Sequence, residues 1–189
     1  MKTIQELYKD YPEIPYISSK RDLLEVNTAP KVPKRNMRRT KEGVLPGHII
    51  LLWRIHFGTF TTEAPFSKYF EYSYGVNGAD ALSFVIEEGY AEVESAFDSL
   101  DHIPATKLKQ ILKEKGVKGL SKMKRSDVDA TLKELLSEEE LGAYFSLRGL
   151  CLTPKGEELL ASYPEIIAKH PQKTRQTHEE KNVFRNRKS

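Results

Sequence analysis

The spacing of apolar residues along the chain predicts a protein built mainly from helices. Between Pro46 and Phe60 apolar residues fall on nearly every face of a helix, so this segment is expected to be a buried core helix. Residues 79–88 place their apolar side chains on one helical face and end at Gly89. Residues 90–94 and 144–152 alternate in polarity, which is typical of short strands.

Polar residues mark where several helices begin. Thr3 is suited to cap a short first helix, and Thr153 is suited to cap a helix whose first residue is Pro154. Ser137 and Glu140 have the spacing of a capping box, in which each residue's side chain accepts a hydrogen bond from the other's backbone amide. These signals predict helix starts on both sides of the 144–152 strand.

A pair of short amphipathic helices is predicted between Ile103 and Leu132, joined by a basic loop. Gly116 lies where the first helix needs a residue in the left-handed conformation to end it. Lys109 and Lys113 are one turn apart on the flank away from the apolar stripe. The predicted stripes are Leu108, Ile111 and Leu112 in the first helix, and Val128, Leu132, Leu135 and Leu136 in the second.

Charge is separated into blocks although the whole chain has a formal net charge of only +3. Lys31–Lys41 holds six cations and no acid, whereas Glu87–Asp101 holds six acids and no cation. Ala105–Arg125 holds eight Lys or Arg against a single acid, and Lys169–Ser189 has a net charge of +5. The 105–125 block favours a polyanionic partner, of which nucleic acid is the first candidate. The alternative for any one block is a solvated surface without a partner.

The predicted helix pair resembles the SAP motif, a helix–loop–helix DNA-binding module found in nuclear, bacterial and phage proteins. The residues that fit the first half of its pattern are Ile103, Leu108, Lys109, Ile111, Leu112, Gly116 and Val117. In the second half, Arg125, Asp127 and Val128 match its Lys, Glu and Leu. The sequence departs from the pattern in a loop about two residues longer and in Met123, Asp129 and Thr131.

This resemblance implies a surface that contacts the phosphates of double-stranded DNA. The residues it assigns to that surface are Lys107, Lys109, Lys113, Lys118, Ser121, Lys122, Lys124 and Arg125. Because phosphate contacts carry no sequence information, little sequence specificity is expected. The structural alternative is an ordinary helical hairpin with a basic solvated face.

Two further segments resemble parts of known proteins. The helix that ends at Gly89 and the strand after it resemble the last helix and wing of a winged-helix domain, and residues 150–160 (LCLTPKGEELL) resemble the closing strand-turn-helix of such regulators. The order of residues 66–94, the helix pair and residues 150–160 is also similar to that of small phage and prophage proteins of low-GC Gram-positive bacteria. That similarity implies an origin rather than a reaction.

No pattern in the sequence indicates an enzyme. His48 and His56 are eight residues apart, which suits packing better than metal binding, and Cys151 is expected to be a small buried hydrophobe. The four glutamates among residues 87–94 are interpreted as a solvated acidic face. We therefore predict no catalytic residues, no metal site, no cofactor and no small-molecule substrate.

The apolar run at residues 49–57 is too short to cross a membrane, and the N-terminus lacks the form of a signal peptide. These features predict a cytoplasmic protein, in a bacterium or a phage-infected cell, without a membrane partner.

The predicted fold is mainly α with a few short β-strands, and it combines a helical module, the SAP-like hairpin and a winged-helix-like strand-turn-helix. Five segments are expected: a basic, proline-rich arm (1–44), an aromatic helical module (45–100), the SAP-like hairpin (101–136), a closing helix-strand-helix segment (137–170) and a disordered basic tail (171–189). The part of the arm that follows the first short helix, through Pro30 and Pro33, is expected to be extended. The Lys31–Lys41 segment and the tail are expected to be mobile.

The predicted function is non-enzymatic DNA binding by a phage or prophage accessory protein. The alternatives are a protein-interaction module, such as a virion or host-takeover factor, and a non-catalytic subunit of a nucleic-acid enzyme.

Overall fold

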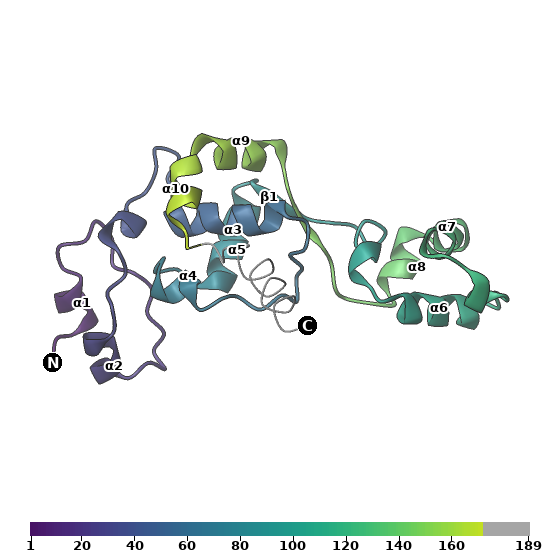
Figure 1. Ribbon diagram of the computed structural model, residues 1–189, viewed down its shortest axis with the longest axis horizontal. Helices are drawn as coiled ribbons and strands as arrows, with labels where there is room; N and C mark the ends of the chain where they lie inside the picture. The colour runs from purple at the N-terminus through teal and green to yellow at the C-terminus, as the bar shows by residue number, and fades with distance from the viewer. Residues whose placement is uncertain (172–189) are drawn as a thin grey trace, which may run out of the picture.

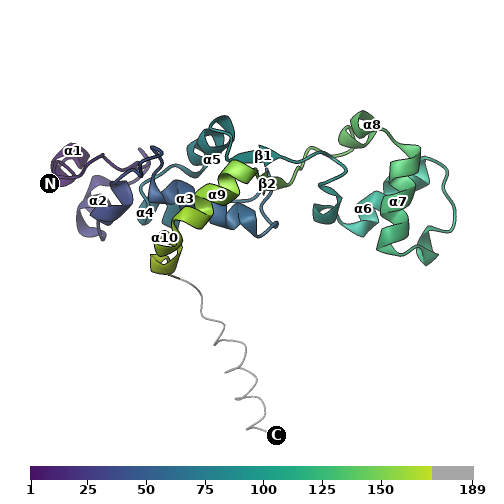
Figure 2. The same ribbon diagram turned by 90° about the horizontal axis from the view of Figure 1, so that it is seen from above.

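The computed structural model describes residues 1–171 and shows a mainly helical chain with one two-stranded antiparallel sheet (Figure 1). This confirms the predicted fold class in its coarse form. The buried apolar residues form two separate cores, one drawn from both ends of the described chain and one drawn only from residues 96–145. We call residues 1–94 with 149–171 the host body, and residues 95–148 the inserted lobe. The lobe lies at one end of an elongated molecule (Figures 1 and 2).

The helix α3 (Pro46–His56) forms the centre of the host body, as its apolar pattern predicts. Ile49 to Leu52 are fully buried. Three helices pack against α3: α5 (Gly78–Glu87), α9 (Pro154–Ser162) and α10 (Pro164–Lys169). The short helix α4 (Tyr69–Tyr72) adds Phe70 to the same core. Two of these helices come from beyond the inserted lobe, so the host core is discontinuous in sequence.

The sheet joins the two parts of the host body. Strand β1 (Ala91–Val93) pairs with β2 (Leu150–Leu152) in the register Ala91–Leu152, Glu92–Cys151 and Val93–Leu150. An isolated bridge between Thr61 and Gly149 adds one more antiparallel contact beside β2. The inserted lobe therefore occupies the connection between two paired strands.

The second strand is much shorter than the predicted 144–152 segment. The guanidinium of Arg148 donates hydrogen bonds to the carbonyl oxygens of Gly142, Phe145 and Leu147. These bonds hold residues 142–148 in a loop, which explains why regular pairing starts only at Leu150.

Within residues 1–44, the prediction of an extended segment after the first helix is wrong. Residues 1–44 contain α1 (Ile4–Leu7), α2 (Leu23–Thr28) and the 3₁₀ turn η1 (Lys34–Met37). Thr3 caps α1 as predicted, because its side chain accepts a hydrogen bond from the amide of Glu6.

The basic Lys31–Lys41 segment is held on the host body by apolar residues that alternate with its cations. Val32 and Met37 are buried in the host core, and the guanidinium of Arg39 forms two hydrogen bonds of 2.8 and 2.7 Å with the carboxylate of Glu13. The spacing of Val32 and Met37 matches neither a helical nor a strand period, so the sequence pattern did not predict that this segment packs on the host body.

The inserted lobe is a small helical unit with its own core. It contains η2 (Leu100–His102), α6 (Ala105–Glu114), η3 (Leu120–Lys122), α7 (Arg125–Leu135) and α8 (Glu138–Gly142). The predicted stripe residues are buried with one exception, since the side chain of Leu135 is 47% exposed. The core residues of the lobe are Ala96, Leu100, Ile103, Leu108, Ile111, Leu112, Val128, Leu132, Leu136, Leu141 and Phe145.

The predicted segment boundaries differ from the grouping that the cores define. The Ser137–Glu140 capping box is present and starts α8, but α8 packs in the lobe with α6 and α7 rather than with a closing segment. Residues 137–147 therefore belong with the predicted hairpin, and residues 149–170 belong with the aromatic module. The predicted disordered tail lies, apart from residue 171, outside the described residues.

Candidate nucleic-acid interface

The basic loop of the inserted lobe is shaped by two glycines. Gly116 ends α6 with a φ of 81°, as predicted, and Gly119 has a φ of 76°. After Gly116 the chain turns back, and the amide of Val117 donates a hydrogen bond to the carbonyl oxygen of Leu112. Val117 packs against the lobe core, which anchors the loop and leaves the lysines that follow in solvent.

The structure places the candidate lysines on the surface of α6, of the loop and of the start of α7. Lys109 and Lys113 line an open depression between α6 and η3, together with Thr106, Gln110, Glu114 and Leu120. Lys109 is partly exposed, and the remaining candidate lysines are exposed: Lys107, Lys113, Lys118, Lys122 and Lys124. Lys109 and Lys113 thus share one face, as their spacing predicts.

The positive charge of these lysines is not neutralised inside the lobe. Within residues 1–171 no lysine forms an ion pair; the pairs that occur use arginines and histidines. Glu114 is the single acid among residues 105–125. This end of the lobe therefore presents uncompensated positive charge to solvent.

Arg125 has a different environment from the lysines. Its guanidinium pairs with Asp129 at 3.2 Å and also donates a hydrogen bond to the carbonyl oxygen of Leu100. This contact ties the start of α7 to η2, so Arg125 has a structural contact that the candidate lysines lack. Ser121 is exposed and remains free to donate a hydrogen bond to a ligand.

The start of α7 carries an acid close to the basic loop. A carboxylate oxygen of Asp127 accepts a hydrogen bond of 3.1 Å from the amide of Lys124. One amide at this helix start is therefore already satisfied, which limits the contacts that the helix N-terminus can make with an anion.

The acidic residues of the lobe lie mainly in the part of the sequence that follows the basic loop. Residues 126–148 contain two cations and six acids. Some of these acids hold the fold together, since the carboxylate of Glu138 accepts hydrogen bonds from the amides of Ala96 and Phe97. The lobe thus has a basic and an acidic part rather than a uniform positive surface.

Lys115 is a candidate that the motif comparison missed. It is exposed at the end of α6 and was counted in the basic block, but the SAP pattern does not assign it a contact. Hydrogen bonds from Ser137 hold the pKa of Glu140 below its usual value, and the charge of Lys115 lowers it further. Lys115 therefore lies on the side of the basic surface that faces α8.

The environments of His48, His56 and Cys151 do not indicate a catalytic role. Burial lowers the pKa of His48 to about 4, and its Nδ1 accepts a hydrogen bond of 3.0 Å from the amide of Leu45. This confirms His48 as a core residue, whereas His56 is half-exposed and lies 3.1 Å from a carboxylate oxygen of Glu157. The prediction that Cys151 is buried is wrong, since its side chain is only partly buried. Burial together with Glu92 raises the pKa of its thiol, which disfavours the reactive thiolate.

Comparison of the chain with protein-family models, curated proteins and solved structures finds no match. The SAP-like and winged-helix-like interpretations therefore rest on the residues of this chain alone. No helix formed by residues 1–171 has the length and apolar character needed to cross a bilayer.

Proposed function

We propose that the inserted lobe binds the phosphate backbone of double-stranded DNA, without catalysis and with little sequence specificity. The observation that carries this proposal is the group of exposed lysines without ion-pair partners at one end of the lobe. Each lysine that neutralises a phosphate releases condensed counterions, and this release drives such binding. The contact residues are Lys107, Lys109, Lys113, Lys118, Lys122 and Lys124, with Ser121 as a hydrogen-bond donor and Lys115 at the margin.

The arrangement of the lobe supports the SAP-like interpretation. Two short helices, α6 and α7, pack through one apolar stripe each, and a glycine-containing basic loop joins them. The lysines lie outside the stripes, so DNA contact would not require the lobe core to open.

The host body offers a second DNA-binding interpretation that its charge disfavours. The order of elements in the host body supports a winged-helix-like interpretation, in which the wing carries the inserted lobe. This order is α3, the strand contact at the Thr61–Gly149 bridge, α4, α5 and the β1–β2 pair. In a helix-turn-helix unit the second helix enters the major groove, and here that helix is α5. Its charged residues are Asp80 and Glu87, both exposed, and it has no cation. Electrostatics therefore favour the lobe over α5 as the DNA contact.

The biological setting that we propose is an accessory DNA-binding protein of a phage or prophage, acting in the bacterial cytoplasm. This setting follows from the sequence similarity described above. If the lobe fails to bind DNA, its separated basic and acidic parts make a protein partner the next candidate.

Charge reversal on α6 tests the proposal. The double variant K109E/K113E is compared with K20E/K68E, which makes the same charge change at two exposed lysines of the host body. Fluorescence anisotropy on a labelled duplex of mixed sequence, at several salt concentrations, gives the dissociation constant and its salt slope.

The unmodified protein should bind with a Kd of roughly 10⁻⁴–10⁻⁶ M at physiological salt, as is typical of non-specific contacts. K109E/K113E should bind at least tenfold more weakly, with a salt slope lower by up to about two units, because each phosphate contact contributes about 0.9. K20E/K68E should bind almost normally. Equal losses in the two double variants, or nanomolar binding to one defined sequence, would contradict the proposal.

A further inference from the structure

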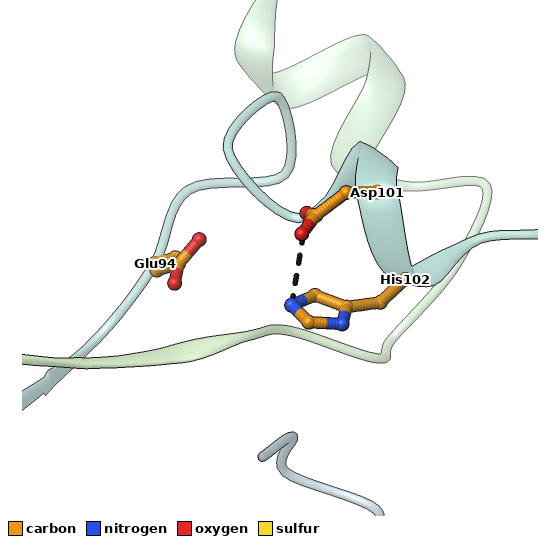
Figure 3. A group of neighbouring side chains, drawn as sticks. All are labelled: Glu94, Asp101 and His102. Carbon is orange, nitrogen blue, oxygen red and sulfur yellow. Dashed lines mark ion pairs between the residues drawn. The ribbon is translucent and has the colours of Figure 1, made fainter. Parts of the chain in front are cut away.

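Three potential metal ligands converge where the inserted lobe joins the host body (Figure 3). Glu94 follows β1 on the host side, whereas Asp101 and His102 lie in η2 of the lobe. One ligand atom from each residue lies within 4.8 Å of the others, and His102 Nε2 is 3.6 Å from Asp101 Oδ1. Asp101 and His102 therefore share one element, whereas Glu94 lies in the connection between β1 and η2.

The backbone around this group is held by hydrogen bonds that fix its shape. The hydroxyl of buried Ser99 accepts a hydrogen bond from the amide of Gly149 at 2.9 Å and donates one to the carbonyl oxygen of Ser95 at 2.7 Å. The amide of Glu94 donates to the carbonyl oxygen of Gly149 at 2.9 Å. These bonds position both sides of the group independently of any ligand.

Because Gly149 has no side chain, it leaves space for the side chains of Glu94 and His102 to approach each other. A Cβ atom at this position would lie 2.7 Å from His102 Nε2 and 3.1 Å from the carboxyl carbon of Glu94. A residue with a side chain would therefore displace one or both of these groups. Glycine is required here for the close approach rather than for its backbone conformation.

The two carboxylates of the group lack compensating donors. Within residues 1–171, neither Glu94 nor Asp101 accepts a side-chain hydrogen bond from an amide, a lysine or an arginine, and His102 is the single basic partner. A bound cation would supply the missing positive charge.

We propose that Glu94, Asp101 and His102 form a binding site for one divalent transition-metal ion of the Zn²⁺ type. One imidazole nitrogen and two carboxylate oxygens are a donor set that zinc accepts, and three protein ligands leave one position for water. Ligands of a tetrahedral zinc ion lie roughly 3.4 Å apart, given metal–ligand distances of about 2.0–2.2 Å. The Asp101 side chain is 69% exposed, so it can turn to close the remaining gap.

Such an ion would cross-link the host body and the inserted lobe, because Glu94 belongs to the host body and the other two ligands belong to the lobe. This site is independent of the proposed DNA surface, since none of its ligands belongs to the basic block.

Calorimetric titration of the full chain, free of any purification tag and treated with chelator, tests the site with ZnCl₂ as the probe. The unmodified protein should bind one equivalent, and E94Q, D101N and H102Q should each bind at least tenfold more weakly. G149A keeps all three ligands but crowds them, so it should also weaken binding. MgCl₂ should bind at least a hundredfold more weakly than ZnCl₂, because imidazole suits zinc and not magnesium.

Two variants control for the loss of an acid or a histidine outside the proposed site. D98N removes a neighbouring acid that is not part of the group, and H56Q removes a surface histidine that pairs with Glu157. Both should leave the titration unchanged. Thermal melting without metal checks that each variant is folded. If another variant unfolds, D101N still tests the site, because the side chain of Asp101 is largely exposed and its replacement should not disturb the fold. Unchanged zinc affinity in D101N and E94Q, or an equal loss in D98N, would overturn the proposal.

Discussion

Replacing Gly156 by Ala is expected to destabilise the host body strongly, because α9 lies against backbone at this position. A Cβ atom on Gly156 would lie 1.9 Å from the carbonyl oxygen of Tyr90. Ordinary carbon–oxygen contacts are about 3.3–3.6 Å, so the two segments must separate by roughly 1.5 Å. That carbonyl also accepts a hydrogen bond of 3.1 Å from the amide of Thr153, and the Thr153 hydroxyl donates to the carbonyl oxygen of Gly89 at 2.6 Å.

The expected cost combines overpacking with weakened hydrogen bonds. Overpacking a close contact costs about 1–3 kcal/mol, and each hydrogen bond lost adds about 1 kcal/mol. A total of about 3 kcal/mol corresponds to a melting temperature lower by roughly 6–12 °C, at about 2–4 °C per kcal/mol for a chain of this size. Circular dichroism during heating, or scanning calorimetry, measures this shift.

Gly142 provides a matched control in α8. A Cβ atom there would closely approach only the guanidinium of Arg148, so it would weaken the hydrogen bond from that group to the carbonyl oxygen of Gly142 and leave the other two in place. Since Ala is the better helix former by about 1 kcal/mol, G142A should melt within a few degrees of the unmodified protein. A melting temperature of G156A within about 2 °C of the unmodified protein, or an equal fall in G142A, would refute the packing described for α9.

Three further predictions follow from the described contacts. Leu112→Ala should lower the free energy of unfolding of the lobe by about 2–5 kcal/mol, since this side chain is fully buried; hydrogen exchange in α6 should detect it, and unchanged protection would contradict it. Arg125→Ala should lower stability by about 1 kcal/mol in urea unfolding, through loss of the contacts with Asp129 and Leu100, yet change DNA affinity less than K109E/K113E does. His48 binds a proton near pH 6.5 when unfolded but only at about pH 4 when folded, because burial lowers its pKa. Stability should therefore fall as the pH drops from about 6.5 to 4, by at most about 1.4 kcal/mol per pH unit, and H48Q should show a shallower fall.

The elements with local signals could be predicted from the sequence. The apolar run of α3 marks a buried helix because no polar face is left for solvent, and Thr153 and Ser137 start their helices by accepting amide hydrogen bonds. The basic loop after α6 was also predictable, because Gly116 and the stripe residues repeat at helical spacing.

The features that depend on distant residues could not be predicted. Nothing near Val93 indicates that its partner is Leu150, because pairing across an insertion leaves no local pattern. Leu135 fits the helical stripe, yet the lobe is too small to cover it. Arg125 matches a basic position of the motif, but its contact with the carbonyl oxygen of Leu100 depends on the fold and has no local signal.

The candidate metal ligands illustrate the same limit. Asp101 and His102 are adjacent in sequence, but Glu94 joins them only through the fold. The sequence showed Glu94 as one acid in a block of six, where a solvated face is the simpler interpretation.

The interruption of the β1–β2 pair also constrains the order in which the chain can fold during synthesis. The lobe is continuous in sequence, so it can form as soon as residues 95–148 have left the ribosome. The host body cannot form at that stage, because α3 packs against β2, α9 and α10, which are synthesised after the lobe. A folded lobe brings Glu94 and Gly149 together and so removes most of the entropy cost of closing a long loop. The nascent host helix, apolar on nearly all sides, must remain protected from other partners until that closure occurs.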